Sequence, residues 1–192
     1  MKGLLSPLNQ QGATLIEAMI AIAILTIGIL TVMVMQVSAI NHSSSAMNRS
    51  EANGVALALL ETLKEIPFDD ANLDEAPPTL PANAPTITVA ELEAVTTRAQ
   101  LQALIDGGKV HTFTAASLPA MQPFVQVPAG ATAGTVVDRA GVSYQLAWAV
   151  QDHVIAGGVT LDKNIWVFMH WDSPMGQNRL RMTTLKYSNV PL

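Results

Sequence analysis

The feature that most constrains the fold is an uncharged apolar run from Ala18 to Met35, preceded directly by Glu17. The run is about 18 residues long, and a helix of that length covers about 27 Å at about 1.5 Å per residue. Because the hydrocarbon core of a bilayer is about 30 Å thick, we predict that this segment is a membrane-spanning helix. Glu17 is the only acidic residue among the first 50. An ionised group is costly there, so we expect Glu17 to have a functional partner.

The composition fits a membrane-tethered, exported protein. The chain has 192 residues, of which 49% are hydrophobic and only 13% are charged. Much of the hydrophobicity lies in the first 40 residues, and the remainder suffices for one globular domain. The formal net charge is −5 and the sequence has no basic run, so we do not expect nucleic acid as the main partner. The absence of cysteine excludes disulfides and cysteine-ligated metal.

The amino terminus has three competing interpretations. A secretory signal peptide has its apolar core before the cleavage site, whereas here a polar stretch, residues 6–12, precedes the core. A plain signal anchor accounts for the hydrophobicity and for Lys2 on the cytoplasmic side, but not for a glycine followed five residues later by a carboxylate. The third interpretation is a cleaved leader, which the family resemblance of residues 12–17 implies. Pro7 keeps the leader from joining the following helix, and Gly12 has no side chain to clash in a narrow protease site.

The segment Gly12-Ala13-Thr14-Leu15-Ile16-Glu17 resembles the leader signal of type IV pilins and type II secretion pseudopilins, and the resemblance extends over about residues 10–40. It implies that a prepilin peptidase cleaves between Gly12 and Ala13 and then methylates the new amino terminus at Ala13. It also implies that Glu17 pairs with the terminal amine of a neighbouring subunit. The residues implied in subunit assembly are Glu17, Thr14, Leu15 and Ile16. The family usually has Phe or Met where this chain has Ala13, and its leaders usually carry more basic residues than Lys2 alone.

Apolar periodicity predicts that the helix continues well beyond the membrane. Val55, Leu59, Leu63 and Ile66 recur at steps of three and four residues, and Pro67 ends the pattern. We therefore expect one helix over residues 13–66, about 80 Å long, with residues 13–40 as its transmembrane and assembly half and 41–66 as its periplasmic half. The alternative is two helices broken near Ser43–Ser45. Residues 1–12 form the leader, and residues 67–192 a globular head.

The head is predicted to combine helices with an antiparallel sheet. Residues 67–89 hold five prolines and are expected to form a surface loop. A capping box at Thr88–Glu91 predicts a helix over Ala90–Asp106 that Gly107 and Gly108 end, and residues 115–135 are expected to be irregular. Three strand-like segments follow at 141–150, 163–171 and 179–187, of which the second is apolar on both faces and suits a central strand. The expected fold class is α+β, a long N-terminal helix packed on a C-terminal antiparallel sheet, which is also the pilin architecture.

The sequence gives no sign of catalytic or metal chemistry. The histidines do not have zinc-site spacing, and no nucleotide-binding or hydrolase motif occurs. We interpret Asp69-Asp70 as part of a solvated loop rather than a calcium site, and His170 as a strand residue that faces the helix or solvent. The three tryptophans suit core packing better than an adhesive patch (Trp148, Trp166 and Trp171). We therefore expect no enzyme, no metal and no cofactor.

Two further segments, 24–30 and 165–187, resemble the anchor and the closing hairpin of PilV-type minor pilins. This resemblance implies a minor pilin of a type IV pilus that supports pilus assembly, adhesion, twitching motility or DNA uptake. Its partners would be other major and minor pilins, prepilin peptidase and the inner-membrane assembly platform. It would cross the inner membrane once, with a cytoplasmic amino terminus and a periplasmic head, and reach the pilus on the cell surface after assembly. The alternatives are a minor pseudopilin of a type II secretion system and an unrelated signal-anchored periplasmic binding domain or enzyme.

Overall fold

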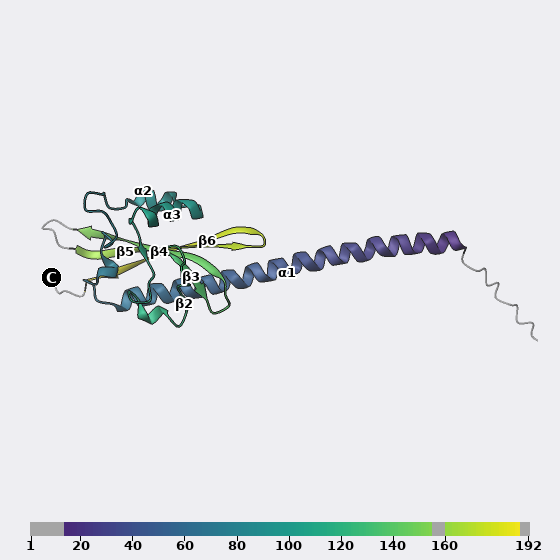
Figure 1. Cartoon of the computed structure of the whole chain (residues 1–192), viewed down its shortest axis with the longest axis horizontal. Coiled ribbons are helices and arrows are strands. Elements are labelled where there is room, and N and C mark those ends of the chain that lie inside the picture. The colour runs from purple at the N-terminus through teal and green to yellow at the C-terminus, as the bar shows by residue number, and fades with distance from the viewer. Residues whose placement is uncertain (1–13, 155–159, 189–192) are drawn as a thin grey trace, which may run out of the picture. The chain divides into compact units, whose positions relative to one another are not determined.

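The computed structural model describes residues 14–154 and 160–188 (Figure 1). The chain divides into two units, residues 1–43 and 44–192, and each is described by itself. Helix α1 (Leu15–Glu65) begins in the first unit and ends in the second. It has 51 residues and contains no proline, so nothing in it removes a backbone donor. The structure therefore confirms the long N-terminal helix, and Ser43–Ser45 do not interrupt it.

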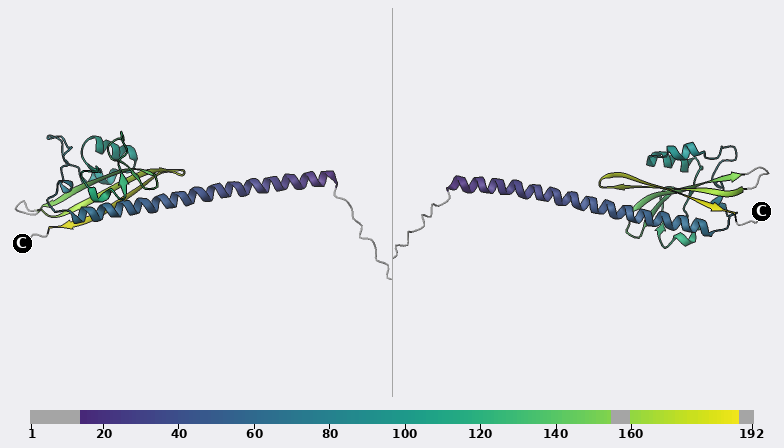
Figure 2. Two further views of the ribbon diagram at one scale, coloured as in Figure 1. Left: turned by 60° about the horizontal axis from the view of Figure 1, so that its bottom comes forward. Right: turned by 180° about the vertical axis from the view of Figure 1, so that it is seen from behind.

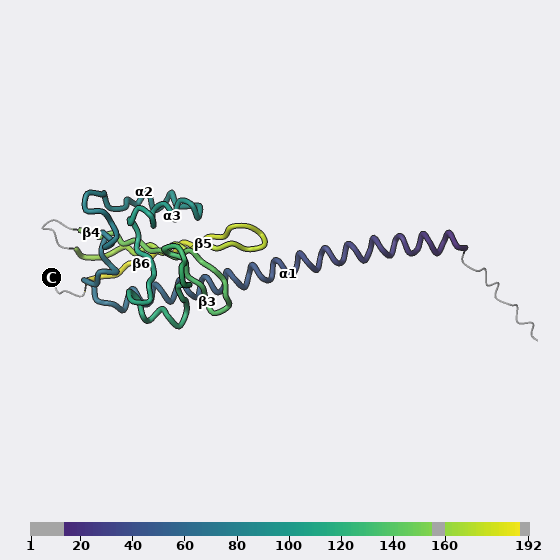
Figure 3. The backbone as a smooth tube through the Cα atoms, viewed as in Figure 1, coloured from purple at the N-terminus to yellow at the C-terminus, as the bar shows by residue number. Residues whose placement is uncertain are grey.

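The second unit is built on one antiparallel sheet. Its long strands are β4 (Ser143–Val154), β5 (Thr160–Ser173) and β6 (Gly176–Tyr187), which follow one another as a meander (Figure 3). The short strands are β1 (His111–Thr112), β2 (Val125–Gln126) and β3 (Thr135–Asp138). The order is β2-β3-β4-β5-β6, and β1 pairs with β4. The central position predicted for the second strand-like segment is confirmed, because β5 pairs with β4 on one side and β6 on the other.

One face of the sheet packs against the part of α1 that lies in this unit. Alternate side chains of β4 and β5 point toward α1, as the predicted alternation requires (Tyr144, Leu146, Trp148, Val150, Ile165, Val167, Met169 and Trp171). On the helix, Val55, Leu59 and Leu63 fill the same core at helical spacing. Each fully buried leucine contributes about 1.5–3 kcal/mol from removal of its apolar surface from water. The α+β class is therefore as predicted.

The opposite face of the sheet is covered by two short helices, α2 (Val89–Ala94) and α3 (Arg98–Asp106), as Figure 2 shows. Leu92, Leu101 and Ile105 pack there against side chains of β4 and β5, including Phe168. The predicted single helix over 90–106 was wrong, because the chain is extended at Thr97. Two successive capping boxes explain the break.

The first capping box, Thr88 with Glu91, was predicted and is present. The second joins Thr97 and Gln100: the Gln100 N–H donates to Thr97 Oγ1 at 3.3 Å, and the Thr97 N–H donates to Gln100 Oε1 at 3.0 Å. A threonine three residues before a glutamine is a sequence signal for a helix start. Here this second capping box starts α3 as a helix separate from α2.

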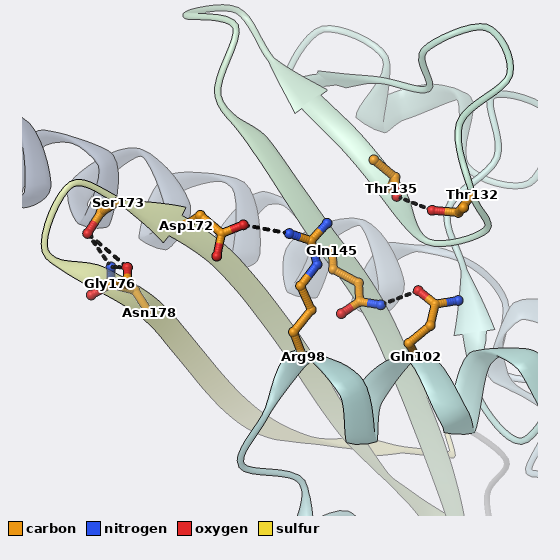
Figure 4. A network of polar contacts seen from close by, with 9 residues as sticks. All are labelled: Arg98, Gln102, Thr132, Thr135, Gln145, Asp172, Ser173, Gly176 and Asn178. Carbon is orange, nitrogen blue, oxygen red and sulfur yellow. Dashed lines mark hydrogen bonds and ion pairs between the residues drawn. The ribbon is translucent and has the colours of Figure 1, made fainter.

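Polar contacts hold α3 to the sheet (Figure 4). Arg98 Nη1 donates to Asp172 Oδ2 at 2.8 Å near the end of β5. The buried amide of Gln145 on β4 donates to the Gln102 side chain of α3. The two contacts come from successive turns of α3, so they fix the direction in which the helix crosses the strands.

The C-terminal end of α1 is tied to β6 by one buried lysine. Lys186 is only 9% exposed, and its Nζ donates to the carbonyls of Leu63 at 2.9 Å, Lys64 at 3.0 Å and Ile66. The last carbonyls of a helix have no partners within the helix and carry the negative end of its dipole. The ammonium of Lys186 therefore satisfies these carbonyls and complements that dipole.

Candidate assembly segment

The candidate site begins at the first turn of α1, where Thr14 acts as the helix cap. Its carbonyl accepts hydrogen bonds from the N–H groups of Glu17 at 3.0 Å and Ala18 at 3.1 Å. Its hydroxyl lies 3.4 Å from the Glu17 nitrogen and accepts a further, long hydrogen bond. Thr14 thereby supplies the side-chain oxygen that a helix start needs. The spacing of Thr14 and Glu17 is typical of a capping box, and it is a sequence signal for a helix that begins at Leu15.

Glu17 lies in the first turn of α1, where backbone N–H groups create positive potential that favours a carboxylate. Thr14, Leu15, Ile16 and Glu17 are thus brought together on one helical turn. Among the described residues, the Glu17 carboxylate makes no hydrogen bond or ion pair, so all its acceptor positions are open to a group from another molecule. Gly12 and Ala13 lie outside the described residues, and the cleavage and methylation sites there remain predictions.

The first half of α1 exposes an apolar surface on every side. All residues from Thr14 to Ile40 are exposed, and Leu15 reaches 83%. No Asp, Glu, Lys or Arg lies between Glu17 and Arg49. Within the described part of the chain, α1 is the one helix long and apolar enough to cross a membrane. A contiguous apolar surface of this size requires lipid or other protein segments around it.

The hydroxyls within this apolar stretch are satisfied by the helix itself. Thr26 Oγ1 donates to the Ile22 carbonyl at 2.8 Å, and Thr31 Oγ1 donates to the Ile27 carbonyl at 2.9 Å. The threonines therefore add no unpaired polar group to the surface, so their hydroxyls are compatible with a hydrocarbon environment.

Gly28 forms a notch in the apolar surface. A hollow beside it is lined by aliphatic side chains that include Ile24, Leu25 and Val32. A Cβ placed on Gly28 would have nothing within 4 Å. Because small residues let helix backbones approach closely in lipid, this notch is suited to receive a side chain from a neighbouring helix.

Two titratable residues of the head, His111 and Asp70, have structural contacts. His111 stacks on Trp148 with 5.4 Å between the ring centroids, and its Nε2 lies 2.8 Å from the Asp74 carbonyl. Burial lowers the pKa of His111, so the ring is neutral near pH 7.

Asp70 caps a short 3₁₀ turn by accepting from the Asn72 N–H at 2.8 Å, which gives part of the acidic loop a structural role. Within the described residues, no group of three His, Asp or Glu side chains could hold a metal ion.

Two of the three tryptophans lie fully in the core that faces α1, in agreement with the packing interpretation. Trp148 and Trp171 are fully buried there, whereas Trp166 is partly buried on the opposite face of the sheet. His170 is a strand residue, as predicted, but the predicted orientation toward the long helix or solvent was wrong, because the side chain is buried on that opposite face.

A family model matches a segment near the start of the chain. Residues 7–33 match the family model described as the prokaryotic N-terminal methylation motif. No curated protein and no solved structure matches the chain. The match covers Gly12–Glu17 and the first part of α1, and it is the signal of type IV pilins and pseudopilins. Together with the apolar helix, it indicates that the chain is anchored in a membrane.

Proposed function

We propose that this protein is a minor pilin of a type IV pilus, closest to the PilV type, and that it enters the filament or its tip and initiation complex. The observation that carries the proposal is the conjunction of the methylation motif with an apolar helical surface that is exposed on every side. Such a surface is suited first to the bilayer and then to a bundle of similar helices. The role is structural, in pilus assembly and in the adhesion, motility or DNA uptake that depends on it.

The chemistry of assembly begins with the leader. In this proposal, prepilin peptidase cleaves between Gly12 and Ala13 and leaves a terminal amine on Ala13, which is then methylated. Glu17 lies four residues further on, about one helical turn away. In the apolar interior of a filament, an unpaired carboxylate or ammonium costs several kcal/mol. Pairing of Glu17 with the amine of the next subunit removes both costs and sets the axial position of the incoming subunit.

The rest of the assembly half supplies packing. Residues 13–40 would serve as the transmembrane and assembly segment, 41–66 as the periplasmic half of the helix, and 67–192 as the head. Leu15 and Ile16 would contact neighbouring helices directly, and Thr14 would keep the first turn helical beside the new amino terminus. The notch at Gly28 would accept a bulky side chain of an adjacent subunit.

The proposal is tested at the mature amino terminus. Mass spectrometry of the membrane-extracted protein should find a chain that begins at N-methyl-alanine, derived from Ala13. Gly12→Trp should block this processing, whereas Gly3→Trp within the same leader should not, because Gly3 lies far from the cleaved bond. A native protein that retains Met1, or a Gly12→Trp variant that still reaches the mature size, would contradict the processing step.

A minor pseudopilin of a type II secretion system is the second candidate, and the methylation motif supports it equally. The two functions differ in the partners that the mature chain contacts. Crosslinking from the exposed apolar face of α1 in intact cells, followed by identification of the linked subunits, separates them. Linkage to pilus subunits supports the first function, and linkage to secretion-system subunits supports the second.

A further inference from the structure

A basic pocket of about 360 Å³ lies where β6 forms the edge of the sheet. Its polar lining includes Arg49 from α1, His170 from β5, and Arg179 and Arg181 from β6. The chain has a formal charge of −5, so a local concentration of arginine is unexpected from composition. All four residues belong to the second unit, and the pocket is a feature of that unit alone.

Strand register creates this arrangement. His170 pairs with Arg179, and Phe168 pairs with Arg181, which places the two arginines at alternate positions on one face of β6. Arg179 Nη1 donates at 3.2 Å to the carbonyl of Thr96, which lies in the connection between α2 and α3. The guanidinium carbon of Arg181 lies 5.5 Å from the centroid of the Trp166 ring. These contacts position the guanidinium groups but leave most of their N–H donors available.

The pocket contains a buried polar side chain without a partner. His170 is 3% exposed and lines the pocket, yet its ring makes no hydrogen bond or ion pair with any described residue. Burial first, and then the charges of Arg179 and Arg98, lower the pKa of His170. The ring is therefore neutral at pH 7 and keeps one N–H to offer a ligand.

The positive charge of the pocket is not balanced by the acidic residues around it. Asp172 is already paired with Arg98 at 2.8 Å (Figure 4). Glu93 is the one carboxylate among the lining residues, against three guanidinium groups. The pocket therefore favours an anionic ligand.

The pocket also extends across the edge of β6. Leu180 packs on the side of the sheet that faces α1, whereas Arg179 and Arg181 lie on the opposite side, and all three line the pocket. In the described sheet, β6 is an edge strand. The N–H and C=O groups along its outer side therefore do not pair with another strand of this sheet. A strand added there would place every second side chain beside the arginines.

We propose that this pocket binds an extended acidic peptide segment of a partner protein, which pairs with the edge of β6 and places carboxylates on Arg49, Arg179 and Arg181. The planar guanidinium group matches a carboxylate with two parallel hydrogen bonds. The neutral His170 supplies a further donor, and backbone pairing with β6 fixes the direction of the peptide. This inference goes beyond the proposed function and does not depend on it.

The test measures peptide binding by the full chain in a nonionic detergent. A fluorescent hexapeptide of alternating Glu and Thr should bind, and the same peptide with Gln in place of Glu should not. Arg181→Gln should weaken binding at least tenfold, and Arg49→Gln should weaken it as well. Arg139→Gln is the matched control, since it removes the same charge from an exposed position outside the pocket and should leave binding unchanged.

Hydrogen exchange tests the placement of the peptide. Amides on the outer side of β6 should become protected when the Glu peptide binds. Equal affinity for the Gln peptide, equal weakening by Arg139→Gln, or no added protection of β6 would overturn the proposal. Displacement of the peptide by inorganic phosphate at equimolar concentration would indicate a small-anion site and would also overturn it. Thermal unfolding of each variant separates loss of binding from loss of fold, and Arg49→Gln keeps the test valid if an Arg181 variant is unstable.

Discussion

Replacing Lys186 with methionine should destabilise the head by about 2–4 kcal/mol. Methionine keeps the length and apolar stem of the side chain but removes the ammonium that donates to the carbonyls of Leu63, Lys64 and Ile66. The Leu63 carbonyl is in a buried environment, and leaving such an acceptor unsatisfied costs about 1–3 kcal/mol. The other two carbonyls are only partly buried, so water recovers part of their loss.

Two smaller terms act on the same contact, in opposite directions. Loss of a cation at the end of α1 removes a favourable interaction with the helix dipole, worth about 0.3–1 kcal/mol. Burial lowers the pKa of Lys186, which means that the folded protein pays a desolvation cost for its charge. Removal of the charge relieves that cost. The net loss therefore stays near the value for one buried carbonyl plus a partial contribution from the other two.

The assay is guanidinium unfolding of the full chain in nonionic detergent, followed by tryptophan fluorescence. Trp148 and Trp171 are both buried in the core that faces α1, so their emission reports on the head. Lys64→Met is the matched control, because Lys64 is an exposed lysine in the last turn of the same helix. A loss below about 0.5 kcal/mol for Lys186→Met, or a loss equal to that of Lys64→Met, would refute the capping argument.

Three further predictions concern assembly and pH. Glu17→Ala should leave leader cleavage intact but reduce the amount of the protein in sheared pili at least tenfold, measured by immunoblot; normal incorporation would contradict the pairing with a neighbour's amine. Gly28→Leu should leave head stability unchanged, since nothing lies within 4 Å of an added Cβ, yet reduce incorporation because the notch is filled; Ala23→Leu on the same helix is the comparison, and equal effects would count against the notch. The stability of the head should fall as the pH drops below about 6.5, because burial lowers the folded-state pKa of His111 and His170 and the unfolded chain takes up their protons first. Combined His111→Gln and His170→Gln should flatten this dependence below about pH 6.5 in unfolding experiments, and an unchanged slope would refute the assignment.

The fold was predictable where one period repeats over many residues. Leu59 and Leu63 continue a helical pattern, and the alternation in β4 persists long enough to specify which side of the sheet is buried. Strands β1 and β2 have two residues each, which is too short for a period to show. The break between α2 and α3 has no proline or glycine, and only the second capping box at Thr97 signals it.

The candidate sites also differ in how far the sequence alone reveals them. Glu17 and its neighbours form a local motif, and a local motif is visible in one sequence. The basic pocket is not local, because Arg49 is on the first helix whereas Arg179 and Arg181 are on the last strand. For this reason the sequence has no basic run that would reveal the pocket. The capping of α1 by Lys186 was likewise invisible, since it requires the register of β6 against the end of α1. Contacts of this kind depend on the tertiary fold and not on spacing.

The residues that stabilise the head are distinct from the residues that we expect to mediate assembly. Every buried hydrophobic residue in the described part lies between Ala52 and Trp171, whereas the side chains from Leu15 to Ile40 are exposed. Changes at Glu17 and Lys186 share no contact, so their effects should be independent. The double variant Glu17→Ala, Lys186→Met should therefore unfold like Lys186→Met alone, within about 0.5 kcal/mol. If Glu17→Ala by itself lowered the free energy of unfolding of the head, the carboxylate would have a role within the subunit, and the pairing with a neighbouring chain would lose its physical basis.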